Sequence, residues 1–97
     1  MLNNKSILIT GGTGSFGKAF ASKILNKYKN IKKLIIFSRD ELKQFELSNL
    51  DLFKKNSKIV RFFLGDVRDF DRIKMAFKDV DIVIHAAALK QVEASEY

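Results

Sequence analysis

Four short apolar runs recur along the chain, and a segment with helical spacing separates each run from the next. The runs are continuous rather than alternating, which is typical of strands buried on both faces of a parallel sheet. They cover residues 7–9, 34–37, 59–64 and 82–86. Strands that alternate with helices predict right-handed crossovers and helices on both faces. We therefore expect an α/β fold with the strand order 3-2-1-4, which is one half of a doubly wound domain.

The three segments between the runs each predict one amphipathic helix. The first helix is expected to place one stripe of side chains on the sheet: Phe16, Ala19, Phe20, Ile24 and Tyr28. The apolar side of the second helix is expected at Leu42, Phe45, Leu50 and Phe53. The third helix is expected to carry Phe70, Ile73 and Phe77.

A glycine-rich turn at residues 10–17 joins the first strand to the first helix. Gly12, Gly14 and Gly17 fit the pattern G-x-G-x-x-G, and Gly11 with the last two fits G-x-x-G-x-x-G. In either pattern one glycine permits the tight turn, one lets the backbone approach a pyrophosphate, and one lets the helix pack closely. The free N–H groups at the helix start then face the phosphates. The turn therefore predicts a Rossmann-type dinucleotide site.

The end of the second strand indicates which nicotinamide cofactor binds. An acidic residue at this place holds the ribose 2′-hydroxyl of NAD, whereas a basic residue accommodates the 2′-phosphate of NADP. Here Ser38 and Arg39 come first, and Asp40 suits a helix cap better than a ribose acceptor, although Ser38 is also a candidate cap. Arg39 can pair a phosphate through two N–H groups, and Lys43 can add charge one turn later. We favour NADP; the alternative is that Arg39 is a solvated turn residue.

Two further segments lie at the same edge of the predicted sheet. Asp66 and Val67 follow the third strand, where a carboxylate and a backbone N–H can meet the adenine edge. The alternative is that Asp66 only caps a helix, with Asp69 as the rival cap. Lys90 is either a contact of a diphosphate or sugar or a solvated lysine. Small side chains after the fourth strand leave room for a ribose, or else serve helix packing: Ala86, Ala87 and Ala88.

Composition argues against several other functions. The chain has no cysteine, and its single histidine, His85, is expected to be buried in the fourth strand rather than to bind a metal. The formal net charge of +7 comes from lysines spread over several predicted helices and turns, which argues against a nucleic-acid partner. No long apolar stretch follows Met1, so we expect a cytoplasmic protein with neither a signal peptide nor a membrane span.

Four motifs together resemble the extended short-chain dehydrogenase/reductase family and, within it, the inverting UDP-N-acetylglucosamine 4,6-dehydratases of bacterial sugar biosynthesis. They are ITGGTGSFG at 9–17, FSRDELKQ at 37–44, FFLGDVRD at 62–69 and VDIVIHAAALKQV at 80–92. The first motif is general to the family, and the second and fourth are more specific to the dehydratases. The resemblance implies an NADP-binding segment over residues 1–97, in a homo-oligomer that makes sugars for surface polysaccharide or flagellin glycan.

The resemblance also implies roles for individual residues. Lys90 would contact the nucleotide sugar, UDP-N-acetylglucosamine. Such enzymes oxidise the sugar at C4, remove the C5 proton, expel water from C6 and return the hydride to C6, which inverts C5. The NADP contacts would come from Thr13, Gly14, Ser15, Phe16, Ser38, Arg39, Asp40, Glu41, Leu42, Lys43, Gln44, Asp66, Val67 and Ala86.

We expect residues 1–97 to bind the cofactor but not to include the catalytic residues of that family. Family members are longer, and their catalytic Tyr-x-x-x-Lys lies beyond Tyr97. Tyr28 and Lys32 match that spacing, but they are expected at the amino end of the sheet, so we interpret the match as chance. Relatives often have proline where this chain has Glu93. A non-catalytic NADP-binding module and a related nucleotide-sugar epimerase or reductase are the alternatives.

Overall fold

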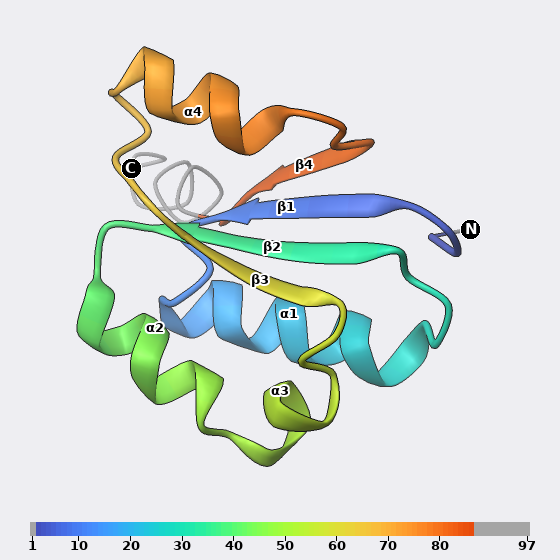
Figure 1. Ribbon diagram of the computed structural model, residues 1–97. Helices are drawn as coiled ribbons and strands as arrows, with labels where there is room; N and C mark the ends of the chain where they lie inside the picture. The colour runs from blue at the N-terminus through green and yellow to red at the C-terminus, as the bar shows by residue number, and fades with distance from the viewer. Residues whose placement is uncertain (1, 87–97) are drawn as a thin grey trace, which may run out of the picture.

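The computed structural model describes residues 2–86, and they form a single four-stranded sheet flanked by helices (Figure 1). The strand order is β3-β2-β1-β4, and every neighbouring pair is parallel. This confirms the Rossmann-type order predicted from the sequence. In chain order the elements are β1 (Ser6–Thr10), α1 (Ser15–Lys27), β2 (Lys33–Ser38), α2 (Glu41–Ser48), α3 (Asp51–Lys55), β3 (Val60–Leu64), α4 (Phe70–Phe77) and β4 (Ile82–His85).

Helices α1, α2 and α3 cover one face of the sheet, and α4 covers the other (Figure 1). Successive side chains of a strand point to opposite faces, so Ile36 packs on the α1 side whereas Phe37 packs with Ala76 of α4. Every residue of β1 is buried, as are Leu34 to Ser38 of β2. Burial on both faces explains why these strands appear in the sequence as continuous apolar runs.

The buried stripe of α1 differs from the predicted one. Phe16 is 42% exposed and Ala19 is also exposed, so the prediction was wrong for both side chains. Ile24 is buried as predicted, and Phe20 and Tyr28 are half-buried. The buried residues of the helix are Gly17, Ala21, Ile24 and Leu25. The face without bulky side chains at its first turn therefore lies against the sheet.

Two helices, α2 and α3, replace the single helix predicted after β2. The hydroxyl of Ser48 and the side-chain amide of Asn49 both donate to the carbonyl of Phe45, at 2.7 and 3.1 Å. A continuing helix would use that carbonyl for the backbone N–H of Asn49, which bonds Glu46 instead. Helix α2 therefore stops at Ser48, and Leu50 becomes the N-cap of α3.

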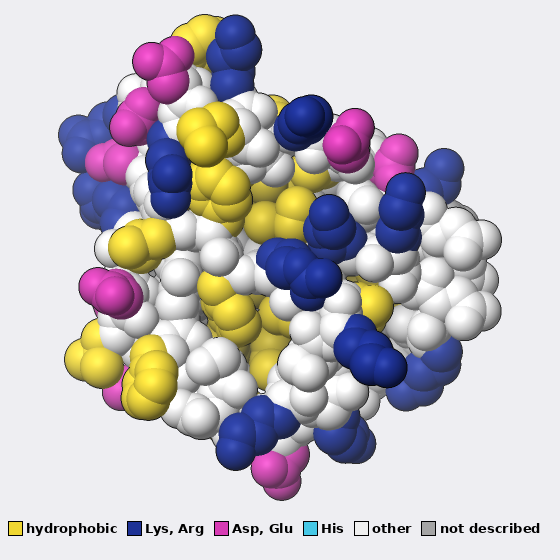
Figure 2. Space-filling view, in the orientation of Figure 1, with side chains coloured by type: hydrophobic (Ala, Val, Ile, Leu, Met, Phe, Trp, Pro, Cys, Tyr) yellow, Lys and Arg dark blue, Asp and Glu magenta, His cyan; other side chains and the backbone are white. Residues whose placement is uncertain are grey.

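Four large hydrophobic residues predicted to face the core from the second and third helices are exposed instead. Leu42 and Phe45 are each 65% exposed, Phe70 is 70% exposed, and Leu50, the N-cap of α3, is 39% exposed. Gln44 and Leu47 occupy the buried side of α2 instead. Figure 2 accordingly shows exposed hydrophobic side chains over α2 and over α4.

Charged side chains are distributed rather than gathered on the face seen in Figure 2. Lysine and arginine groups lie in several separate places there, with acidic groups between some of them. Within the described range 2–86, no helix has the length and apolar character needed to cross a membrane.

The strand order reverses between β1 and β4, and this reversal positions the site. Because all four strands are parallel, their last residues meet at one edge of the sheet. In open α/β sheets, ligands bind outside this carboxyl edge, where loops on either side of the reversal separate. The last residues of the strands are Thr10, Ser38, Leu64 and His85.

We predict that Gly17→Ala destabilises the fold. A Cβ at residue 17 would collide with the carbonyl oxygen of Gly11 and lie 2.6 Å from the Cα of Gly12, and neither is a flexible side chain. Crowding of this kind costs about 1–3 kcal/mol of unfolding free energy. Chemical denaturation should show that loss. Gly14→Ala is the matched control, because its Cβ would meet only the Gly11 oxygen at 3.5 Å. Equal losses in the two variants would contradict the packing argument.

Candidate nucleotide-binding site

One backbone hydrogen bond fixes the glycine turn beside the end of β2, and a second lies within the turn. Gly11 has a φ of 69°, in the left-handed region that favours glycine, and its N–H donates to the carbonyl of Phe37 at 2.9 Å. The N–H of Gly14 then donates back to the carbonyl of Gly11 at 3.1 Å. Helix α1 therefore begins at the carboxyl edge, next to the first residues after β2.

The glycines of the turn do different things. A Cβ at Gly12 would lie 2.7 Å from Cγ2 of Ile36, so this glycine and Gly17 allow close packing within the protein. Gly14 has ordinary space around its Cβ position, with only the Gly11 oxygen near it. Packing therefore does not require glycine at residue 14, whereas the approach of a ligand to the backbone would.

The start of α1 is suited to an anion. Gly14 is its N-cap, no side chain caps it, and its first turn contains no acidic residue. The first N–H groups of a helix have no partner within the helix, and the helix dipole places partial positive charge there. Of the predicted contacts, Ser15 and Phe16 form this first turn, and both are exposed.

Of the residues after β2, Asp40 has a structural role, whereas Arg39, Glu41 and Leu42 are exposed on the surface. Asp40 is the N-cap of α2, and its carboxylate accepts from the backbone N–H of Lys43 at 3.0 Å. Of the two candidate caps, Ser38 is therefore not the one used. The Arg39 side chain is 70% exposed. Glu41 and Leu42 are exposed on α2 and do not line the cleft described below.

Asp66 joins the ends of β2 and β3 electrostatically. One of its oxygens accepts from Arg39 at 3.4 Å and from the Arg68 terminal nitrogen at 2.9 Å. The other accepts from the backbone N–H and Nε of Arg68, at 2.9 and 3.2 Å. These bonds, chiefly those from the Arg68 side chain, hold the pKa of the Asp66 carboxyl far below its usual range. Asp69, and not Asp66, caps α4 by accepting from the N–H of Arg72 at 3.2 Å.

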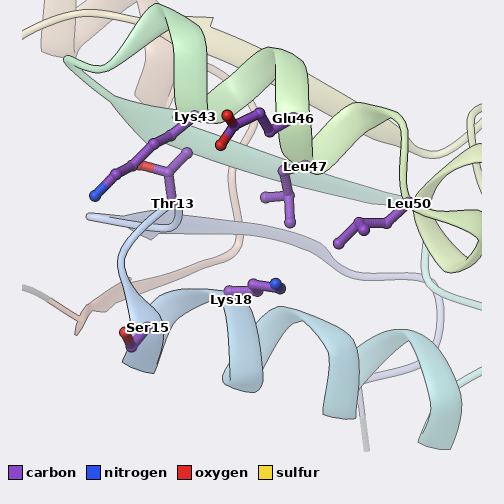
Figure 3. A pocket seen from close by; sticks show the side chains of 7 residues that line it. All are labelled: Thr13, Ser15, Lys18, Lys43, Glu46, Leu47 and Leu50. Carbon is purple, nitrogen blue, oxygen red and sulfur yellow. The ribbon is translucent and has the colours of Figure 1, made fainter.

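A cleft of about 280 Å³ lies between α1 and α2 (Figure 3). Thr13 of the glycine turn and Lys43 lie toward one end of it, and Leu50 lies toward the other. Three of the predicted contacts, Thr13, Ser15 and Lys43, thus share one cavity. The full lining is Thr13, Ser15, Lys18, Lys43, Glu46, Leu47 and Leu50.

Two polar residues of this cleft, Lys18 and Glu46, were not predicted. Each follows a predicted contact by three positions, since Lys18 follows Ser15 on α1 and Glu46 follows Lys43 on α2. Residues three apart are neighbours on a helix surface. Extending the predicted contacts by one helical turn would have found both.

At the strand reversal, β1 and β4 are joined through side chains. The hydroxyl of Thr10 lies 3.0 Å from Nδ1 of His85. His85 is exposed, so its predicted burial was wrong; as the last residue of β4 it has reached the edge of the sheet. Ala86 follows and is only 2% exposed. The predicted residues Ala87, Ala88 and Lys90 lie outside the described range.

Tyr28 and Lys32 do not join this site. Tyr28 is the C-cap of α1, and Lys32 directly precedes the first residue of β2. Both therefore lie at the amino end of the sheet, opposite to the glycine turn. This location agrees with the interpretation of their spacing as chance.

Comparisons with known proteins were consistent with this geometry. The chain is 57% identical over 97 residues to the UDP-N-acetylglucosamine 4,6-dehydratase (inverting) of Campylobacter jejuni strain 81-176. It is 48% identical over 99 residues to the UDP-glucose 4-epimerase of Rickettsia bellii strain OSU 85-389. Each match covers the whole chain but 28% of the relative, so the chain spans little more than a quarter of these curated proteins.

Two solved structures resemble this one, and in each the match covers about a quarter or less of the solved chain. The X-ray structure of Pen from Bacillus thuringiensis matches with a TM-score of 0.73 and 35% identity, covering 86% of this chain and 24% of that one. A structure described as A-type ketoreductases from a modular polyketide synthase has a TM-score of 0.61 at 24% identity, covering 84% of this chain and 18% of that one; at this identity the likeness shows the fold alone.

The fold, the glycine turn and the sequence comparisons agree with one another. A Rossmann-type sheet of this order implies a nucleotide cofactor at its carboxyl edge. The sequence model of the family described as "polysaccharide biosynthesis protein" matches residues 7–97. That match covers nearly all of the sequence, and the chain therefore belongs to the polysaccharide biosynthesis protein family.

Proposed function

We propose that this chain is the NADP-binding portion, over residues 1–97, of a cytoplasmic nucleotide-sugar 4,6-dehydratase that acts on UDP-N-acetylglucosamine. The observation that carries the proposal is the cationic end of β2, where Ser38 and Arg39 stand in place of the acid that NAD would require. The 57% identity to the Campylobacter dehydratase over the whole chain supports it. NADP, when bound, supplies the acceptor for hydride from sugar C4 and the donor of hydride to C6.

The carboxyl edge offers suitable groups for each phosphate of this cofactor. The N–H groups at the start of α1 suit the pyrophosphate, and Gly14 leaves the space to reach them. Among residues 2–86 the Arg39 side chain makes one hydrogen bond, to Asp66, so its other N–H groups can pair with the 2′-phosphate. Lys43 and Thr13 lie toward the same end of the cleft and add a charge and a hydroxyl.

The proposed adenine contact of Asp66 requires an exchange of partners. Its carboxylate already accepts four hydrogen bonds, which is about the number that two carboxylate oxygens can accept. The 3.4 Å bond from Arg39 is the longest of the four. In our proposal Arg39 turns from Asp66 to the 2′-phosphate, which leaves Asp66 free to accept from the adenine amine.

The sugar chemistry is proposed to use residues outside the described range. Ala86 is only 2% exposed, and Lys90 is proposed to contact the nucleotide sugar. Tyr28 and Lys32 lie at the opposite end of the sheet from the glycine turn. We therefore assign no proton transfer to any residue between 2 and 86.

A related nucleotide-sugar epimerase is the second candidate. The 48% identity to the Rickettsia UDP-glucose 4-epimerase favours it, since that match also covers the whole chain. The two candidates share the cofactor site proposed above. They differ in whether the sugar loses water at C6, and only the product can distinguish them.

We predict that Arg39→Ala lowers NADP affinity about tenfold to a hundredfold and changes NAD affinity little. A charge-assisted bond to phosphate contributes roughly 1.5–3 kcal/mol, and about 1.4 kcal/mol corresponds to a factor of ten. Fluorescence titration with both cofactors measures the effect. Lys29→Ala is the control, because it removes the same charge from an exposed position near the amino end of the sheet. Equal losses for NADP and NAD would refute the assignment of Arg39.

Gly14→Val is predicted to abolish binding of both cofactors while the chain stays folded. The Cβ at this position has space in the protein, so stability should remain close to that of the unchanged chain. The added side chain would occupy the space that the pyrophosphate needs. Circular dichroism and cofactor titration together check this result. Tight NADP binding by the folded variant would contradict the proposed pyrophosphate site.

A graft tests the function as a whole. Replacing the matching 28% of the Campylobacter dehydratase with this chain should give an enzyme that converts UDP-N-acetylglucosamine to its 4-keto-6-deoxy product. Mass spectrometry detects the loss of water. The same graft into the Rickettsia epimerase is the comparison. A chain that restores epimerisation but not dehydration would favour the second candidate.

A further inference from the structure

Gln44 connects α2 to the ends of two strands through one buried amide group. The side chain is on α2, and the residue is 8% exposed. Its Nε2 lies 2.9 Å from the hydroxyl oxygen of Ser38, at the end of β2, and 3.2 Å from the carbonyl oxygen of Phe63 in β3. The same nitrogen lies 3.5 Å from the carbonyl oxygen of Ser38. Gln44 was predicted to contact the cofactor, but this nitrogen is occupied by the protein itself.

The chemistry of these groups fixes the direction of each hydrogen bond. A carbonyl oxygen only accepts, so the nitrogen of the Gln44 amide, and not its oxygen, must face Phe63. The same nitrogen has no lone pair to offer, so the Ser38 hydroxyl accepts from it. The Ser38 O–H must then donate in another direction. Among residues 2–86 the structure gives that O–H no acceptor.

Ser38 lies where its O–H could reach a cofactor bound at the carboxyl edge of the sheet. It is 7% exposed, it directly precedes Arg39, and it ends the strand next to the glycine turn. Its side chain points to the same face of the sheet as that of Ile36, because side chains alternate along a strand. That face carries α1, α2 and the cleft between them.

We infer that Gln44 is a positioning residue for cofactor selection: it holds the Ser38 hydroxyl as an acceptor, so that the Ser38 O–H donates to the 2′-phosphate of NADP. The inference rests on the NADP-binding function proposed above. It assigns Gln44 a role through Ser38 and not a contact with NADP. A purely structural Gln44 would instead support α2 without distinguishing one cofactor from the other.

The test is a double-mutant cycle with Gln44→Met and Ser38→Ala, read as the affinities for NADP and NAD. Methionine keeps the length of the side chain and its neutral charge but removes the donor. We expect Ser38→Ala to weaken NADP binding about tenfold and Gln44→Met threefold to tenfold, with NAD binding unchanged in both. In the Ser38→Ala background, Gln44→Met should cause no further loss of NADP affinity.

The cycle separates this inference from the proposal on which it rests. Equal affinity of the unchanged chain for NADP and NAD would overturn both. A clear preference for NADP, combined with an effect of Gln44→Met that persists in the Ser38→Ala background, would overturn the inference alone. Equal losses of NADP and NAD on Gln44→Met would also overturn it, because they would indicate a structural role.

A second measurement needs no substitution and applies even if Gln44→Met fails to fold. Nuclear magnetic resonance of the unchanged chain can follow the side-chain amide protons of Gln44 as NADP is added. We expect them to exchange slowly with solvent before and after binding, since Gln44 keeps its bond to Ser38. A nuclear Overhauser contact between these protons and the cofactor would overturn the inference.

Discussion

The candidate site depends on the close packing of α1 against its own glycine turn. Gly17 of α1 lies against the backbone of Gly11 and Gly12. The two segments are so close that a Cβ at residue 17 would collide with that backbone. This contact holds the start of α1 at the carboxyl edge, beside the end of β2. It also leaves Gly14 as the outer residue of the turn, where a ligand can reach the backbone. One packing constraint therefore sets both the helix and the anion site.

At the carboxyl edge, Asp66 holds the exposed guanidinium group of Arg39 by a single ion pair. Asp66 accepts two hydrogen bonds from the Arg68 side chain and one from its backbone, so its negative charge is largely committed to that neighbour. Arg39 makes one longer bond to the same carboxylate and is otherwise exposed. Its pairing with Asp66 is therefore the weaker one, since exposed pairs contribute little. A phosphate can compete for Arg39 without disrupting the turn that Arg68 fixes.

The sequence was sufficient for the sheet but not for the helix faces. Runs of apolar residues and the glycine turn predicted the strand order, because burial on both faces leaves little ambiguity. Which face of a helix is buried depends on contacts that the helical spacing of apolar residues does not reveal. Gly17 packs because it lacks a side chain, and a hydrophobicity pattern does not register that. Gln44 is buried because its amide finds partners in β2 and β3, so Leu42 and Phe45 are turned outward. The assigned roles of single residues at the site stay predictions.

The rotation of α2 links this fold detail to the proposed cofactor selectivity. Only Gln44 and Leu47 are buried on α2, so one polar and one apolar side chain fix which face of the helix meets the sheet. Lys43 precedes Gln44 and therefore points away from the core, toward the cleft that Thr13 shares. If Leu42 or Phe45 were on the buried face, α2 would be rotated about its axis, and Lys43 would no longer point toward the cleft. The exposure of Leu42 and Phe45 therefore accompanies the burial of Gln44 against Ser38 and the position of Lys43 at the cleft.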